Sequence, residues 1–251
     1  MSAQRLIVGS GTSEDAWSGD GWLHGLPRAD LDRLLPRGHR IVVVAPHPDD
    51  EVLGIGGTLA MLCAGAAREI LTVAVTDGEA SHSGAGAWTR ERLRAARPLE
   101  TESALAALGV PVQVSRLGVA DGGIAAAEME LGERLATLLR PGDRVLTTWM
   151  LDGHPDHEAT ARAARRAAGH AGATTLEFPV WGWHWSRPGD GGLDAMRALR
   201  IEVEPAALAR KRAALAAFRS QIEPDPLSGE GPILPPTALA RFLRPFEVLL
   251  T

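Results

Sequence analysis

Short β-branched runs alternate with alanine-rich stretches of helical length from residue 40 onward. The runs lie at 41–45, 70–76, 112–117, 145–148 and 175–180, and the helical stretches at 57–66, 89–108, 129–139 and 155–168. Because a strand, a helix and a second strand in that order form a right-handed crossover, the pattern predicts a mainly parallel sheet covered on both faces. We expect a single-domain, Rossmann-like, three-layer α/β/α fold with its active site at the carboxyl ends of the strands.

The segments that flank this alternation are less regular. Residues 1–39 mix glycine, charge and isolated tryptophans, which predicts an arm packed on the body of residues 40–251, with a short helix near 30–35. Beyond residue 186 we expect a strand over 198–203 and a helix over 205–220. The 223–236 loop holds five prolines and three acidic residues, which predicts an ordered loop or lid beside the site.

Composition excludes several classes of protein. With 251 residues, 45% of them hydrophobic, the chain can bury one substantial core, and its single cysteine, Cys63, allows no intrachain disulfide. A net charge of -5 gives no electrostatic basis for binding nucleic acid or an anionic membrane. No apolar stretch is long enough to span a bilayer and no signal pattern opens the chain, so we expect a cytoplasmic protein whose oligomeric state the sequence leaves open.

The first polar motif, His47-Pro48-Asp49-Asp50-Glu51, follows the predicted strand at 41–45. Adjacent carboxylates that emerge from an apolar strand repel each other unless a positive charge compensates them, and a divalent cation would do so. His47 and Asp50 are three residues apart, so a tight turn can point both at one centre. Asp49 then projects elsewhere and is free to accept a proton.

The second motif, His154-Pro155-Asp156-His157, follows the predicted strand at 145–148 and opens a predicted helix. His154 and His157 can share one face of the first helical turn. Two histidines and one aspartate suffice for a catalytic zinc site that keeps one position open for water. Asp156 is expected to orient and charge His154, which would stabilise an oxyanion or protonate a leaving amine.

We therefore take His47, Asp50 and His157 as metal ligands, with Zn²⁺ as the expected ion. The same ligands would also accept Fe²⁺ or another divalent cation, because the set is not selective. Zinc lowers the pKa of bound water to about 7, and Asp49 is the expected acceptor of its proton.

The two motifs together resemble the paired signature of the PIG-L or LmbE-like metal-dependent N-deacetylases. Members of that family remove acetyl groups from N-acetylated amino sugars, including glycolipid and thiol precursors and some glycopeptide antibiotics. The resemblance implies zinc ligands at His47, Asp50 and His157, a general base at Asp49, and an acid or oxyanion partner at His154.

One departure from the family pattern concerns the position two residues before His154. Some members carry a tyrosine there that helps to polarise the substrate carbonyl. This chain has Asp152 at that position and contains no tyrosine at all. We therefore expect His154 to take the oxyanion role alone or together with the metal.

Candidate substrate contacts are Asp77, Asp152, His184 and Trp185. Asp77 either binds a substrate hydroxyl or closes a turn with the following glycine. The tryptophans at 181, 183 and 185 alternate along a predicted strand, where they either pack in the core or form a wall for stacking a sugar or acyl group.

These features predict a metal-dependent hydrolase that removes an N-acetyl or other N-acyl group from an amino sugar or its conjugate. A metal-dependent esterase or phosphoesterase with the same ligands, and a non-catalytic metal- or sugar-binding module, are the alternatives. The expected partner is a small N-acetylated sugar or glycoconjugate. The sequence identifies neither the sugar nor its aglycone.

Overall fold

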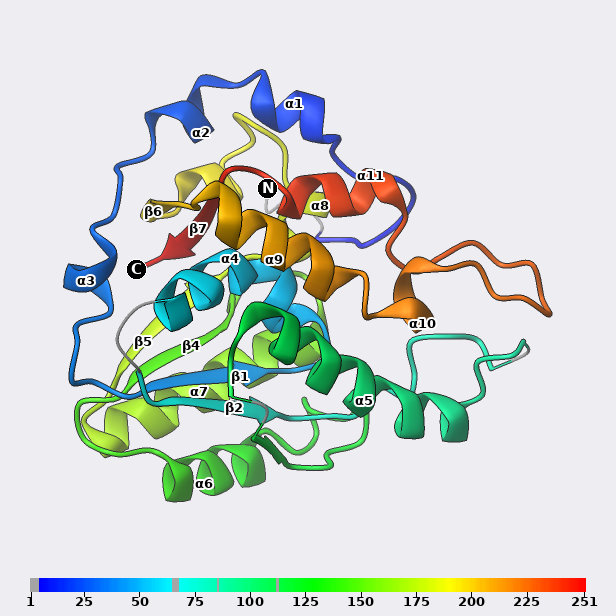
Figure 1. The fold of residues 1–251 in the computed structure, drawn as a ribbon, viewed down its shortest axis with the longest axis horizontal. Helices are drawn as coiled ribbons and strands as arrows, with labels where there is room; N and C mark the ends of the chain where they lie inside the picture. Colours follow the sequence, from blue (N-terminus) through cyan, green and yellow to red (C-terminus); the bar gives the residue numbers. More distant parts are fainter. Residues whose placement is uncertain (1–4, 65–67, 85, 112) are drawn as a thin grey trace.

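The computed structural model describes residues 5–64, 68–84, 86–111 and 113–251. Within these residues a seven-stranded sheet has the order β3-β2-β1-β4-β5-β7-β6 (Figure 1). Strands β1 to β5 pair in parallel, and β7 is antiparallel to its neighbours β5 and β6. The strands are β1 (Ile41–Ala45), β2 (Ile70–Ala74), β3 (Val114–Arg116), β4 (Arg144–Thr148), β5 (Thr174–Phe178), β6 (Ala198–Glu202) and β7 (Phe246–Leu250).

Helices cover both faces of the sheet, so the expected three layers are confirmed. One layer consists of α6 (Glu128–Leu138) and α7 (Pro155–Ala171), and the other of α4 (Asp50–Ala64), α5 (Arg90–Leu108) and α9 (Pro205–Leu215) (Figure 1). Short helices are α1 (Glu14–Ser18), α2 (Gly21–Gly25), α3 (Leu31–Leu34), α8 (Gly182–Trp185), α10 (Arg219–Ile222) and α11 (Pro236–Leu239), with 3-10 turns at Leu193–Ala195 and Ala240–Phe242.

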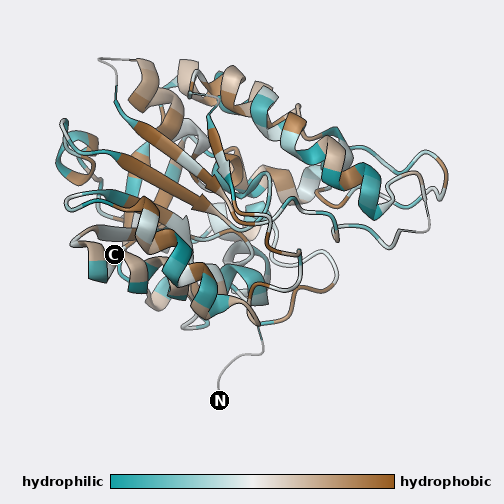
Figure 2. Cartoon of the chain, turned by 90° about the horizontal axis from the view of Figure 1, so that it is seen from below, coloured by the Kyte–Doolittle hydropathy of each residue, from teal (hydrophilic) through white to brown (hydrophobic). Residues whose placement is uncertain are grey.

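The residues of β1 show how the sheet separates two hydrophobic cores. Val42 belongs to a buried cluster with Leu131 of α6, whereas Val43 belongs to another cluster with Leu59 of α4 and Leu105 of α5. Because successive strand residues point to opposite faces, the β-branched run in β1 is buried on both sides. Figure 2 shows the same arrangement, with hydrophobic strands between helices that carry hydrophilic surfaces.

The order of strands places the two His-rich motifs together. The chain proceeds from β1 to β2 on one side of β1, while β4 lies on its other side, so the sheet has a switch point between β1 and β4. Ligands of open α/β sheets bind at such a point, beyond the carboxyl ends of the strands. The first motif follows β1 and the second follows β4.

Several predicted elements differ from the observed ones. Helix α4 begins at Asp50, not at residue 57, and the predicted 205–220 helix is interrupted between Leu215 and Arg219 because Phe218 is non-helical (φ -81°, ψ 58°). Helix α7 continues beyond residue 168 to Ala171 and ends at Gly172, which adopts φ 69°. The predicted 181–185 strand is wrong, since residues 182–185 form α8. Parts of the predicted 57–66 helix (65 and 66) and 112–117 strand (112) lie outside the described residues.

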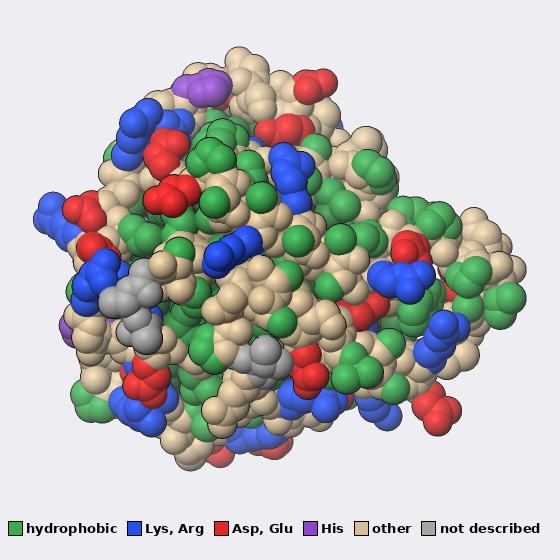
Figure 3. Space-filling view, viewed as in Figure 1, with side chains coloured by type: hydrophobic (Ala, Val, Ile, Leu, Met, Phe, Trp, Pro, Cys, Tyr) green, Lys and Arg blue, Asp and Glu red, His purple; other side chains and the backbone are tan. Residues whose placement is uncertain are grey.

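The N-terminal arm lies along one side of the body (Figure 1), and Trp17 of α1 and Trp22 of α2 both pack against Trp183 of α8. Trp17 in α1 is buried, and its Nε1 donates a hydrogen bond to the backbone oxygen of Trp183 (2.9 Å). Among the described residues no helix is long and apolar enough to cross a membrane. Charged side chains of both signs are interspersed on the face drawn in Figure 3.

Candidate active site

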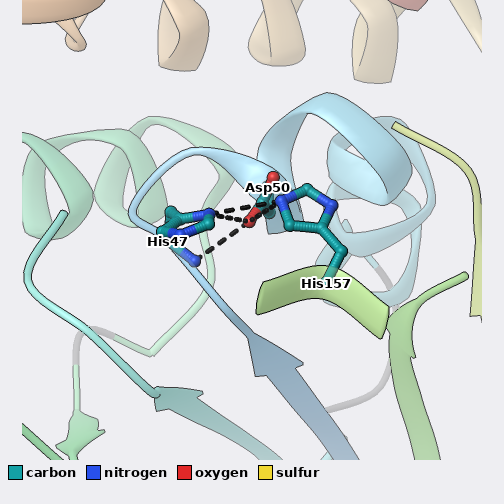
Figure 4. Close-up of side chains that lie close together, drawn as sticks. All are labelled: His47, Asp50 and His157. Atoms are coloured by element: carbon teal, nitrogen blue, oxygen red, sulfur yellow. Dashed lines mark hydrogen bonds and ion pairs between the residues drawn. The ribbon is translucent and has the colours of Figure 1, made fainter. Parts of the chain in front are cut away.

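Three side chains from separate elements converge at the switch point (Figure 4). His47 lies in the turn after β1, Asp50 is the first residue of α4, and His157 lies in the first turn of α7. His47 Nδ1 is 3.2 Å from His157 Nε2, and each of these nitrogens is 3.3 Å from Asp50 Oδ2. All three residues are buried.

The spacing of these donor atoms fits one metal ion. A tetrahedral zinc ion with ligand distances near 2.0–2.1 Å sets its ligands about 3.3–3.5 Å apart. The three donors are therefore spaced like one face of such a tetrahedron, with the fourth position left to a non-protein ligand. A second group that could hold an ion consists of His47, His154 and Asp156, and both Asp156 oxygens accept backbone N–H groups, those of Gly122 and Ile124.

Asp152 lies behind His157 and does not line the cavity. Its side chain is fully buried, and Oδ2 accepts a hydrogen bond from His157 Nδ1 (2.7 Å). The remaining contacts are hydrogen bonds from the backbone N–H groups of residues 180, 181 and 182 at 2.8–2.9 Å. These contacts hold the His157 ring with its Nε2 toward His47 and Asp50, which is how a carboxylate behind a metal-ligating histidine acts.

His47 is oriented in the same manner by two other carboxylates. Its Nε2 is 3.3 Å from both Asp121 Oδ1 and Asp156 Oδ2. The structure thus places the Asp156 carboxylate beside His47, whereas the sequence predicted that it pairs with His154. The sequence did not single out Asp121 as a site residue. Its only signal was that an acidic residue lies in the turn that follows β3.

The carboxylates change the proton affinity of both imidazoles. Burial lowers the pKa of His157, but Asp50 and Asp152 outweigh this effect and raise the pKa to about 9. Burial likewise opposes protonation of His47, and Asp121, Asp156 and Asp50 raise its pKa well above the ordinary value. A cation that binds these nitrogens must displace a proton, so the centre couples metal binding to proton release.

Asp49 lines the same cavity as His47 and Asp50, and the backbone takes an unusual conformation at this residue. Its φ is 116°, and among the described residues it is the only non-glycine residue with a positive φ. Arg97 donates to its Oδ2 (3.0 Å), and no described residue bonds Oδ1. Burial raises the pKa of Asp49 to about 7, although Arg97 opposes the shift.

Arg97 is a second residue that the sequence did not identify. Arg97 of α5 is buried, and its guanidinium donates to Pro48 O (2.5 Å) and Gly78 O (2.8 Å). The guanidinium therefore clamps the turns after β1 and β2 and fixes Asp49 between them.

His154 caps α7 and faces the cavity. Its Nδ1 accepts the backbone N–H of Asp156 (3.2 Å), and its ring lies 4.9 Å from that of His47. Burial and the neighbouring His157 and His47 lower the pKa of His154 to about 3. The imidazole is consequently neutral, with its proton on Nε2, whereas the sequence predicted a ring charged by Asp156.

A cavity of about 310 Å³ opens onto this cluster. Its polar lining includes His47, Asp49, Asp50, Arg97, Asp121 and His154. None of the four candidate substrate contacts lines it. Asp77 pairs with Arg116 (2.7 Å), His184 bonds Val8 O (3.0 Å), and Trp185 donates to Asp152 O (2.8 Å) while it stacks on Trp149.

The chain matches a known protein family and several solved structures. The family profile PIG-L, described as GlcNAc-PI de-N-acetylase, matches residues 42–168, and no curated protein sequence matches. The conserved protein TT1542 from Thermus thermophilus is 30% identical over 73% of this chain and 80% of its own, with a TM-score of 0.54.

Two deacetylase structures are similar at lower identity, which shows the fold alone. They are the N,N'-diacetylchitobiose deacetylase from Pyrococcus horikoshii (19% identity, 77% of this chain, 76% of that chain, TM-score 0.56) and the A40926 pseudoaglycone deacetylase (23%, 84%, 96%, 0.58). The family match spans half of the chain and contains both His-rich motifs. This chain therefore belongs to the PIG-L family.

Proposed function

We propose that this protein is a zinc-dependent N-deacetylase that removes an acetyl group from the amine of an N-acetylated amino sugar or its conjugate. One observation carries the proposal: three metal-ligating atoms lie 3.2–3.3 Å apart beside an aspartate with a free carboxylate oxygen. Membership of the family supports it, as does the likeness to structures named as deacetylases of diacetylchitobiose and of an antibiotic pseudoaglycone.

His47, Asp50 and His157 would hold the metal. Two imidazoles and one carboxylate are a usual ligand set for catalytic zinc, and Fe²⁺ is the alternative because the set is not selective. A divalent cation bound here would polarise the amide carbonyl and lower the pKa of a water molecule at the open position.

Asp49 is the proposed general base. Its Oδ1 accepts a proton from the attacking water while Arg97 holds Oδ2, and a pKa raised to about 7 suits proton transfer at neutral pH. Water adds to the carbonyl carbon, and His154 donates its Nε2 proton in a hydrogen bond to the carbonyl oxygen as negative charge develops there. Asp49 then delivers the proton to the amine nitrogen as the C–N bond breaks, which yields acetate and a free amine.

The test separates this activity from that of an esterase or a phosphoesterase. Purified protein is stripped of metal, reloaded with Zn²⁺ or Fe²⁺, and analysed for bound metal. Acetate release is measured from N-acetylglucosamine and diacetylchitobiose, and compared with hydrolysis of an acetate ester and a phosphomonoester. We expect one metal per chain and metal-dependent amide hydrolysis. Phosphate or ester hydrolysis without amide hydrolysis would contradict the proposal.

A further inference from the structure

The cavity beside the candidate metal centre has a wall of apolar side chains. Four parts of the chain supply it: the N-terminal arm, α4, the turn after β5 and the 223–236 loop. The wall consists of Ile7, Leu53, Val180, Trp181, Ile233 and Leu234. Leu53, Val180 and Leu234 are buried, whereas the other three remain partly exposed and can lose further surface to a ligand.

Hydrogen bonds connect the N-terminal arm and the 223–236 loop, which supply part of this wall, to the rest of the protein. Val8 O, next to Ile7, is bonded by His184, and Thr12 N donates to His184 O (2.9 Å). In the 223–236 loop, Leu234 N donates to Gln221 O (2.9 Å), and the Asp225 carboxylate accepts backbone N–H groups of residues 87, 88, 227 and 228. The wall is therefore present before a ligand binds, as is common in small-molecule sites.

The charges that line the cavity leave no cation for an anionic ligand. Asp49, Asp50 and Asp121 are acidic. Among the described residues that line the cavity, Arg97 is the only arginine or lysine. The Arg97 guanidinium is already occupied by Asp49, Pro48 O and Gly78 O. A bound divalent cation together with Arg97 would balance the three carboxylates. No surplus positive charge would remain to hold a phosphate or a carboxylate.

We propose that the substrate is an uncharged N-acylated amino sugar that carries an apolar group against this wall. The inference rests on the proposed deacetylase function and specifies its substrate class. The apolar group belongs either to the aglycone or to the acyl chain, since both adjoin the scissile amide. A volume of about 310 Å³ suits one sugar ring with a small substituent, because small-molecule sites begin near about 300 Å³.

The test compares substrates that differ only in the relevant group. For the zinc-loaded enzyme, kcat/KM is measured by amine release from the methyl and phenyl glycosides of N-acetylglucosamine, from N-acetylglucosamine 1-phosphate, and from N-hexanoylglucosamine. We expect one of two results. Either kcat/KM for the phenyl glycoside is at least tenfold higher than for the methyl glycoside, or kcat/KM for the hexanoyl amide is at least tenfold higher than for free N-acetylglucosamine. The kcat/KM for the 1-phosphate should be at least tenfold lower than that for the methyl glycoside. Equal rates for methyl and phenyl glycosides and for acetyl and hexanoyl amides, or a preference for the phosphate, would overturn the inference.

Variants locate the preference on the wall. Ile7→Ser and Ile233→Ser should each reduce the preference for the apolar compound severalfold. Leu6→Ser and Leu227→Ser are matched controls from the same segments, since their side chains are 54% and 79% exposed and do not line the cavity. The controls should keep the wild-type preference. An equal change in all four variants would contradict a role for the wall.

Binding separates a failure of this inference from a failure of the proposed function. Calorimetry on metal-free protein measures the Kd of the methyl and phenyl glycosides and of the acetyl and hexanoyl amides without turnover. Tighter binding of an apolar compound without hydrolysis of any compound would refute the deacetylase activity but keep the ligand class. Hydrolysis of all four sugars with no difference in rate or Kd would keep the activity and refute the ligand class.

Discussion

Two adjacent aspartates differ in proton affinity because their side chains have different neighbours. Burial raises the pKa of Asp50, but His157 and His47 outweigh it and hold the pKa far below its usual range. Asp49, at a backbone φ of 116°, has a pKa that burial raises to about 7. One carboxylate is thus suited to remain ionised as a ligand and the other to exchange a proton near neutral pH.

Asp49→Asn should separate proton transfer from metal binding. Asparagine tolerates positive φ and keeps the shape of the side chain, so the turn should be retained. We expect kcat to fall by about 10²–10⁴, while elemental analysis finds the same metal content as in the wild type. If the variant lost its metal together with its activity, Asp49 would be a ligand and not the base.

Asp152→Asn should weaken metal binding without changing the lining of the cavity, to which Asp152 does not belong. The amide has one acceptor oxygen, whereas the carboxylate accepts from His157 and from three backbone N–H groups. Loss of such an orienting partner costs about 10–100-fold in metal affinity, which a competitive chelator titration measures. Asp77→Asn is the matched control, because Asp77 pairs with Arg116 outside the cavity. Equal affinities of the two variants would contradict the orienting role.

The convergence of His47, Asp50 and His157 was predictable from sequence, whereas the residues that contact these three side chains were not. His47 and Asp50 lie in one turn, and the strand-then-helix pattern places His157 at the same edge of the sheet. Asp121, Asp152 and Arg97 act through contacts between segments far apart in the chain. Local spacing carries no information about such contacts.

At the scale of elements, α4 is broken one turn after it places Asp50. Ile55 has φ -138°, and a side chain at Gly54 would overlap the Phe178 ring, so close packing explains this glycine. Glu247 accepts the freed N–H groups of residues 57 and 58 (2.7 Å each), and Lys211 Nζ donates to Leu53 O (2.8 Å) and to Glu247 (2.6 Å). The single lysine of the chain is therefore buried and holds the break in α4.

Lys211→Met should destabilise the protein strongly, since it leaves Glu247 buried without its cation. Breaking a buried ion pair from one side costs about 3–5 kcal/mol, which urea unfolding measures as a loss in the free energy of unfolding. Arg140→Met is the control, because the Arg140–Glu69 pair is more than half exposed and should contribute less than about 1 kcal/mol. Losses of similar size in both variants would refute this account of α4.

Elements governed by local periodicity were predicted well, and those governed by tertiary contacts were not. The parallel strands and α5, α6 and α7 follow from buried runs and helical spacing. Residues 181–185 alternate Trp with smaller residues, which is typical of a strand, but Asp152 binds their first backbone N–H groups and a short helix forms. No periodicity within that segment indicates its distant partner.

At the scale of the whole molecule, the N-terminal arm shares the core of the body. Trp17 is fully buried and packs edge to face on Trp183 (5.2 Å between ring centroids). Arg244 lies over the Trp183 ring and pairs with Glu14 of the arm (2.6 Å). These contacts lead us to infer that residues 1–39 and 40–251 unfold together, although the sequence predicted only that the arm packs on the body.

Trp17→Ala tests this inference. Removal of a buried tryptophan costs about 3–5 kcal/mol, and the loss should appear as one shifted transition when urea unfolding is followed by both circular dichroism and tryptophan fluorescence. Trp22→Ala is the comparison, since Trp22 is only partly buried and should cost less. If the arm were an independent segment, the unfolding transition of the body would stay at its wild-type position.

Brief proteolysis of Trp17→Ala gives a second test. An independent arm would be removed from the variant while the rest of the chain resisted cleavage. A shared core predicts instead that the arm is cleaved faster only under conditions that unfold the whole protein, because Trp17 belongs to the same hydrophobic cluster as Leu59 and Leu105.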